Sequence, residues 1–99
     1  MTKKLDPIHP GEILKDTLDA AGISLNELSR ALRVPVGRIS EIVNGKRAIT
    51  ADTALRMGRY FNTSAQMWLN LQSRYDLEVA ERESGERIAK EVLALARPA

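Results

Sequence analysis

The chain has 99 residues, of which 43% are hydrophobic and 28% charged, and its formal net charge is +2. This is the length of one small domain with an ordinary globular balance, which argues against disorder. The absence of cysteine excludes disulfides, thiolate metal sites and a cysteine nucleophile, and it fits a reducing cytoplasm. No apolar run approaches the roughly 18 residues of a membrane span, and no signal peptide is expected after the two N-terminal lysines.

The charges are unevenly distributed along the chain. Residues 28–60 contain seven Lys or Arg and two acids, whereas residues 76–91 contain six acids and three bases. A basic centre next to an acidic segment suggests two different partners, one of them a polyanion. The plain alternative for both segments is a solvated surface of mixed sign.

Helical spacing and capping residues predict an all-α chain without strands. A first helix should begin near Pro10, where a proline loses no hydrogen bond, and end at Gly22. Ser24, with an acid three residues later, forms the capping-box pattern of a second helix. A third helix is expected from about Pro35 to Asn44. The residues expected to face the core are Ile13, Leu14, Leu18, Ala21, Leu25, Leu28, Ala31, Leu32, Ile39, Ile42 and Val43.

Thr50 and Ser64 are the expected caps of a fourth and a fifth helix. Ser84-Gly85 should interrupt the fifth helix and leave a last helix from Glu86 to Ala96. The chain would then divide into a main domain (1–83) and a C-terminal helical tail (84–99). Residues expected to be buried on these elements are Ala54, Leu55, Met57, Gly58, Phe61, Trp68 and Leu71.

Residues 24–47 are the most informative stretch, because they read as two short helices joined by the tight turn Arg33-Val34-Pro35. This is the helix-turn-helix arrangement, whose second helix enters the major groove of DNA. The start of that helix meets base edges, and its end and the following loop suit phosphates. The expected base-edge residues are Val36, Gly37, Arg38, Ser40 and Glu41, and the expected phosphate contacts are Ser24, Asn44, Lys46 and Arg47.

These side chains differ in what they can recognise. Arg38 is the strongest candidate, since a guanidinium can bind guanine O6 and N7 together. Val36 can touch a thymine methyl group, and Gly37 allows the backbone to approach DNA closely. Ser40 suits a base or a phosphate. Glu41 either accepts from a cytosine amine or orients Arg38. The plain alternative for each residue is a solvated surface group.

A single recognition helix binds weakly, so this reading requires a homodimer on a palindromic operator with half-sites roughly 34 Å apart. The fifth helix carries more apolar residues than one small core covers, with Trp68 and Leu71 expected to point inward. The residues expected at the dimer interface are Leu69, Tyr75, Leu77 and Val79.

An enzyme is not expected. His9 is the one histidine, and no second ligand, nucleophile or phosphate-binding loop accompanies it. A structural role under the first helix is the expectation for His9, and neither a metal nor a cofactor is implied.

Residues 9–14 (HPGEIL), 38–56 (RISEIVNGKRAITADTALR), 68–72 (WLNLQ) and 75–77 (YDL) together resemble the HigA (VapI-like) antitoxins of the Xre/lambda-repressor-like helix-turn-helix superfamily. The resemblance covers about residues 5–80. It implies a compact five-helix domain with a C-terminal helical extension, acting in a bacterial type II toxin–antitoxin module. The implied partners are a HigB-type toxin, which is a ribosome-dependent endoribonuclease, and double-stranded operator DNA, bound by a homodimer that represses its own operon. The implied location is the cytoplasm, at the nucleoid.

Three positions depart from the superfamily pattern. Ser29 stands where alanine is common, Arg33 stands where glycine is common, and Leu25 replaces a residue that often contacts a phosphate at the start of the second helix. Arg33 is therefore expected to adopt a left-handed backbone conformation, at a cost of order 1 kcal/mol.

The resemblance does not fix the acidic segment after Tyr75. Charge alone suggests that Glu78, Glu81, Glu83 and Glu86 complement a basic ribonuclease toxin. Two alternatives to the antitoxin reading remain. One is a free-standing phage-like repressor without a toxin partner, and the other is a protein-interaction module that does not bind DNA.

Overall fold

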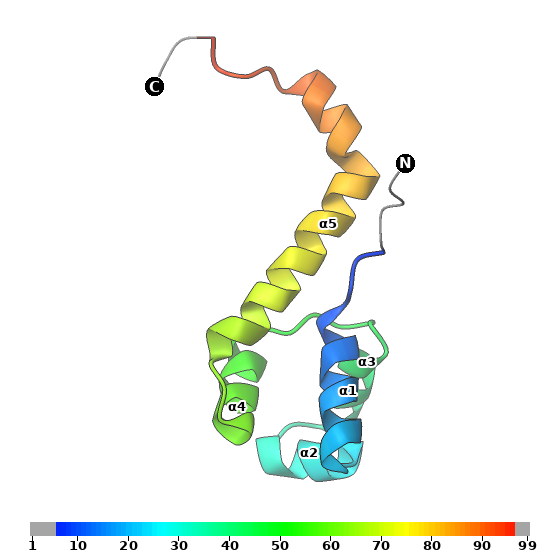
Figure 1. Ribbon diagram of the computed structural model, residues 1–99, viewed down its shortest axis with the longest axis vertical. Coiled ribbons are helices and arrows are strands. Elements are labelled where there is room, and N and C mark those ends of the chain that lie inside the picture. Colours follow the sequence, from blue (N-terminus) through cyan, green and yellow to red (C-terminus); the bar gives the residue numbers. More distant parts are fainter. Residues whose placement is uncertain (1–5, 97–99) are drawn as a thin grey trace.

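The computed structural model describes residues 6–96 and contains five helices in that range, without strands. The helices are α1 (Pro10–Ala21), α2 (Leu25–Leu32), α3 (Val36–Val43), α4 (Ala51–Phe61) and α5 (Ala65–Glu91). The all-α expectation is therefore confirmed. Helices α1 to α4 gather at one end of the molecule, and α5 starts beside α4 and runs away from them (Figure 1). The N-terminal lysines and the last three residues of the expected tail lie outside the described residues.

The predicted caps begin three of the helices, α2, α4 and α5. Ser24, Thr50 and Ser64 each accept a hydrogen bond from the backbone N–H three residues later, at 3.1, 3.4 and 3.0 Å. Helix α1 begins at Pro10 as expected, but its cap is His9, whose Nδ1 accepts from the Gly11 N–H at 2.9 Å. Sequence reasoning missed this cap, because histidine is not among the residues preferred at that position.

The turn between α2 and α3 confirms the expectation for Arg33. Its backbone has φ 60° and ψ 44°, the left-handed region. Its N–H donates to the carbonyl of Arg30 at 3.3 Å, and the N–H of Val34 donates to the carbonyl of Ser29 at 3.1 Å. These bonds close the end of α2 and fix the direction in which the chain enters α3.

The core lies among α1–α4 and the start of α5, with Trp68 of α5 almost fully buried. Ala21, Ala31 and Leu55 were expected in this core, but they are exposed, Leu55 by 65%. Leu55 lies one position off the buried stripe of α4, which runs through Ala54, Met57 and Gly58. The buried hydrophobic residues are Leu14, Leu18, Leu28, Leu32, Val34, Ile39, Ile42, Ile49, Ala54, Met57 and Trp68.

Helix α5 corrects two expectations about the C-terminal part. The predicted break at Ser84-Gly85 is wrong, because α5 is continuous from Ala65 to Glu91. The predicted last helix is wrong as well, since its first half belongs to α5 and residues 92–96 are not helical. A glycine inside a helix costs only about 1 kcal/mol relative to alanine. The boundary proposed between residues 83 and 84 thus falls inside a single helix.

Ion pairs one turn apart accompany the continuous α5. Arg74 contacts Glu78 at 2.9 Å and Arg87 contacts Glu91 at 3.9 Å, while Arg82 reaches Asp6 in the N-terminal segment at 2.9 Å. Pairs at this spacing support exposed helices by a few tenths of a kcal/mol each. Within residues 6–96, no helix combines the length and the apolar character that crossing a bilayer requires.

Candidate nucleic-acid interface

The outer face of α3 is open. Ile39 and Ile42 are buried, which fixes the inner side of the helix. Val36, in the first turn of the helix, is 42% exposed. A Cβ atom added at Gly37 would meet no atom within 4 Å, so this position borders open space. The start of α3 therefore presents its backbone and its small side chains outward, as a helix that enters a groove requires.

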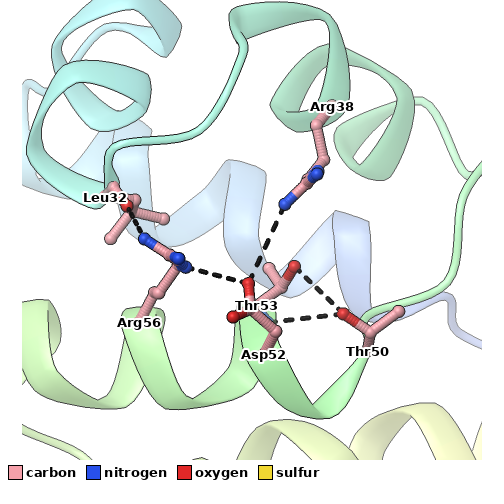
Figure 2. Close-up of polar contacts among 6 residues, drawn as sticks. All are labelled: Leu32, Arg38, Thr50, Asp52, Thr53 and Arg56. Atoms are coloured by element: carbon pink, nitrogen blue, oxygen red, sulfur yellow. Dashed lines mark hydrogen bonds and ion pairs between the residues drawn. The ribbon is translucent and has the colours of Figure 1, made fainter.

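Arg38 does not extend alone from this face. Its Nη1 lies 3.9 Å from Asp52 Oδ2 in the first turn of α4. The same carboxylate accepts from Arg56 Nε at 2.8 Å, and Arg56 Nη1 donates to the carbonyl of Leu32 at 2.9 Å (Figure 2). The hydrogen bond from Arg56 holds the pKa of Asp52 below its usual value, with smaller contributions from the charges of both arginines. A polar chain thus joins the end of α2, the start of α4 and Arg38.

Glu41 contacts a different arginine from the one expected. Arg47 donates to Glu41 Oε1 through Nε and Nη2, at 3.1 and 2.9 Å. The loop after α3 folds back, because the Lys46 N–H donates to the carbonyl of Glu41 at 2.8 Å, and this places Arg47 beside the helix. The suggested contact of Glu41 with Arg38 is therefore replaced by an ion pair with Arg47.

The residues expected at phosphates fall into two groups. Ser24 and Asn44 line one depression together with Leu25 and Val43, so the start of α2 lies beside the end of α3. Arg47 belongs to a second group, because it lines a different hollow together with Arg38, next to the start of α4. Asn44 caps the end of α3, and its Nδ2 is 3.5 Å from Ser40 Oγ. Lys46 is exposed and forms no ion pair within residues 6–96.

A buried glutamine anchors the loop that carries Lys46 and Arg47. Gln72 of α5 is 7% exposed. Its Oε1 accepts from the Ile49 N–H at 2.8 Å, and its Nε2 donates to Asp76 Oδ1 at 2.9 Å. Sequence reasoning gave Gln72 no role. The available signal was a polar residue four positions after Trp68, on the buried face of the helix.

His9 has the structural role that was expected. It is buried, and its ring lies edge-on to Tyr75 with the ring centroids 4.8 Å apart. Burial lowers the pKa of His9 below its usual value, although the charges of Glu12 and Asp76 act in the opposite direction. The Nδ1 atom is occupied as a hydrogen-bond acceptor. No group of three or more side chains suited to a metal occurs in the described part of the chain.

The four residues expected at a dimer interface lie along α5 with unequal exposure. Leu69, Tyr75 and Val79 are half-buried within the chain, and Leu77 is 60% exposed. Tyr75 also borders a hollow of about 310 Å³ whose wall includes Ile8 and Leu71. Tyr75 therefore already has a packing role inside a single chain.

The acidic residues expected to meet a toxin lie on the outer half of α5. Glu81, Glu83 and Glu86 are exposed. Glu78 is half-buried and pairs with Arg74 at 2.9 Å. This part of α5 extends away from the other helices (Figure 1).

Comparison with known proteins agrees with this geometry. Residues 14–68 match the model of a helix-turn-helix family. The chain is 52% identical over 81 residues to virulence-associated protein I of Dichelobacter nodosus, a match that covers 81% of this chain and 75% of that protein.

Two solved structures share the fold closely. One is an addiction module antidote protein of the HigA family from Coxiella burnetii, with 47% identity, a TM-score of 0.89, and coverage of 92% of this chain and 100% of that one. The other is the Pseudomonas aeruginosa antitoxin HigA with the higBA promoter, with 50% identity, a TM-score of 0.88, and coverage of 90% and 98%. The chain therefore belongs to the Xre-type helix-turn-helix family, in the group of HigA (VapI-like) antitoxins, whose members are DNA-binding regulators rather than enzymes.

Proposed function

We propose that the chain is the antitoxin of a bacterial type II toxin–antitoxin module. It binds its palindromic operator as a homodimer through α3, and it neutralises a HigB-type ribosome-dependent mRNA endoribonuclease by direct binding. The observation that carries the DNA half is the open outer face of α3, with Arg38 at its edge and the Lys46-Arg47 loop at its end. The similarity to an antitoxin solved with its promoter supports the same half.

The α3 face accounts for both recognition and affinity. Arg38 binds guanine O6 and N7, Val36 contacts a thymine methyl group, and Gly37 keeps the backbone close to the groove. Lys46 contacts a phosphate directly. Arg47 exchanges Glu41 for a phosphate, because an exposed ion pair of this kind is worth only about 0–1 kcal/mol.

Two copies related by a two-fold axis present two α3 helices to half-sites roughly 34 Å apart. Helix α5 supplies the pairing surface in this proposal. Leu77 is exposed, and Leu69 and Val79 are only half-buried, so apolar area remains to be covered on this helix. A 27-residue helix, about 40 Å long, is long enough to pair with its symmetry mate and still extend beyond the contact.

The DNA half is tested by titrating the promoter of the chain's own gene, and a scrambled duplex of the same composition, at two salt concentrations. Arg38→Ala should cost about 1–3 kcal/mol on the promoter and relax the preference at one base position. Lys46→Ala should weaken binding to both duplexes equally and reduce the salt slope by about one. Lys90→Ala, on the outer part of α5, removes the same charge and should change neither.

Three results would contradict this assignment. An equal loss on both duplexes would make Arg38 a phosphate contact. An unchanged salt slope for Lys46→Ala would show that Lys46 does not contact a phosphate. The absence of any binding at low salt would leave a protein-interaction module.

The toxin half depends on the exposed acidic residues of α5. The test is co-expression with the product of a short basic reading frame beside the gene, followed by measurement of growth and of complex formation. Replacing Glu81, Glu83 and Glu86 by glutamine should weaken the complex and lower its sensitivity to salt. A gene without such a neighbour, or a complex that ignores these changes, would favour a free-standing phage-like repressor.

A further inference from the structure

We propose that Asp52 is a positioning residue that gives Arg38 its preference for a base edge over a phosphate. This inference rests on the proposed binding of operator DNA through α3. It assigns a role to a side chain of α4, outside both α3 and the basic loop that carries Lys46 and Arg47.

The carboxylate of Asp52 is held in place by Arg56. Arg56 Nε donates to Oδ2 at 2.8 Å, and Arg56 is itself held by its bond to the Leu32 carbonyl at 2.9 Å. Arg38 approaches the same oxygen from α3, with its Nη1 at 3.9 Å (Figure 2). Arg56 and Asp52 lie one turn apart on α4. Helix α2 packs against both α4 and α3, and this packing sets the position of the carboxylate relative to α3.

The contact restrains Arg38 without consuming its donors. A separation of 3.9 Å is an ion pair but is longer than a hydrogen bond, so the guanidinium N–H groups remain available. A hollow of about 200 Å³ bordered by Arg38, Arg47, Thr50 and Asp52 gives the side chain room to turn outward. The restraint thus biases the direction of Arg38 while leaving it able to reach a groove.

The charge of Asp52 discriminates between the two kinds of acceptor on DNA. A phosphate next to Arg38 would bring a full negative charge close to the carboxylate and be repelled. The acceptor edge of guanine is neutral, so it gains the two hydrogen bonds of Arg38 with much less repulsion. A fixed acid beside a reading arginine therefore disfavours the wrong ligand class, which is how specificity is commonly obtained. Asp52 is ionised at neutral pH as any exposed aspartate is, and the hydrogen bond from Arg56 lowers its pKa further.

The experiment compares the affinities of the full chain for the promoter duplex and for the scrambled duplex. Asp52→Asn should strengthen binding to the scrambled duplex more than to the promoter, lowering the ratio of the two affinities about threefold to tenfold. Asp52→Glu, which keeps the charge, should retain most of the ratio. Glu91→Gln is the matched control, since it makes the same charge change in an exposed pair with Arg87 near the far end of α5.

The double variant separates positioning from general electrostatics. If Asp52 acts through Arg38, then Asp52→Asn introduced into Arg38→Ala should leave the affinity ratio of Arg38→Ala unchanged. Thermal unfolding of each variant shows whether the fold is retained. We expect the Asp52 variants to fold, because 61% of the Asp52 side chain is exposed.

Two results would overturn the proposal. One is an affinity ratio for Asp52→Asn that equals the wild-type ratio, or that changes only as much as the ratio for Glu91→Gln does. The other is a ratio change that persists without Arg38. A wild-type chain that binds both duplexes equally would instead refute the proposed operator binding itself, and this inference with it.

Discussion

The contact between α1 and α3 leads to the sharpest stability prediction. A Cβ atom added at Gly11 would lie 1.8 Å from the carbonyl oxygen of Ile42 and 2.7 Å from its carbonyl carbon. Both atoms belong to the backbone of α3, so no side-chain rotation can relieve the overlap. Gly11→Ala therefore requires α1 and α3 to separate.

The size of that movement sets the expected cost. Ordinary contact begins near 3.4 Å, so the two helices must separate by about 1.6 Å at this point. Overpacking of this kind typically costs about 1–3 kcal/mol, occasionally more. The upper end applies here, because Gly11 is buried and its N–H also bonds the capping His9. The displaced helix carries Arg38, so operator affinity should fall as well.

Gly37→Ala is the matched control, because it makes the same chemical change on α3 at a position that borders open space. Alanine is the better helix former by about 1 kcal/mol, so this variant should be as stable as wild type or more stable. It should nevertheless lose operator affinity if the backbone of α3 lies against DNA. Urea unfolding followed by circular dichroism measures both free energies of unfolding. If the two variants unfold within about 0.5 kcal/mol of each other, the close approach of α1 to α3 is wrong.

Three further predictions concern stability and are checked by denaturant unfolding. Burial lowers the pKa of His9 in the folded state. The contribution of neutral His9 to the free energy of unfolding should therefore be complete above pH 6.5 and be lost as the pH falls through the lower folded-state pKa. His9→Asn, which keeps an acceptor for Gly11, should remove that part of the pH dependence, and an equal decline in both proteins would contradict this. Arg33→Gly should add about 0.5–1 kcal/mol by relieving the left-handed backbone, and a loss of stability would exclude strain there. Gln72→Ala should cost about 1–3 kcal/mol because a buried loop N–H loses its acceptor, whereas Gln66→Ala, on the exposed side of α5, should cost little.

Helix starts were predictable because their signals are local. Ser24, Thr50 and Ser64 act as caps through atoms within three residues, and the left-handed turn at Arg33 followed from its place in a recognised motif. The break expected at Gly85 failed for the opposite reason. A weak helix former was given more weight than the helical residues on both sides of it, although its cost in a helix is small.

The candidate site was only partly predictable. The pattern of α3 identifies the outward residues, because buried Ile39 and Ile42 fix the orientation of the helix. The partners of those residues depend on tertiary geometry. Asp52 is 14 positions from Arg38 and reaches it only because α4 packs behind the turn. Glu41 pairs with Arg47 because the loop folds back, which residue spacing on a helix does not reveal.

Helix α5 joins two regions with different structural constraints. Its first turns hold Trp68 and Gln72, on which the core and the basic loop depend. Its outer turns carry mostly exposed side chains that the core does not need. The fold should therefore tolerate substitutions in the outer turns, whereas changes at Trp68 or Gln72 would disturb the whole domain.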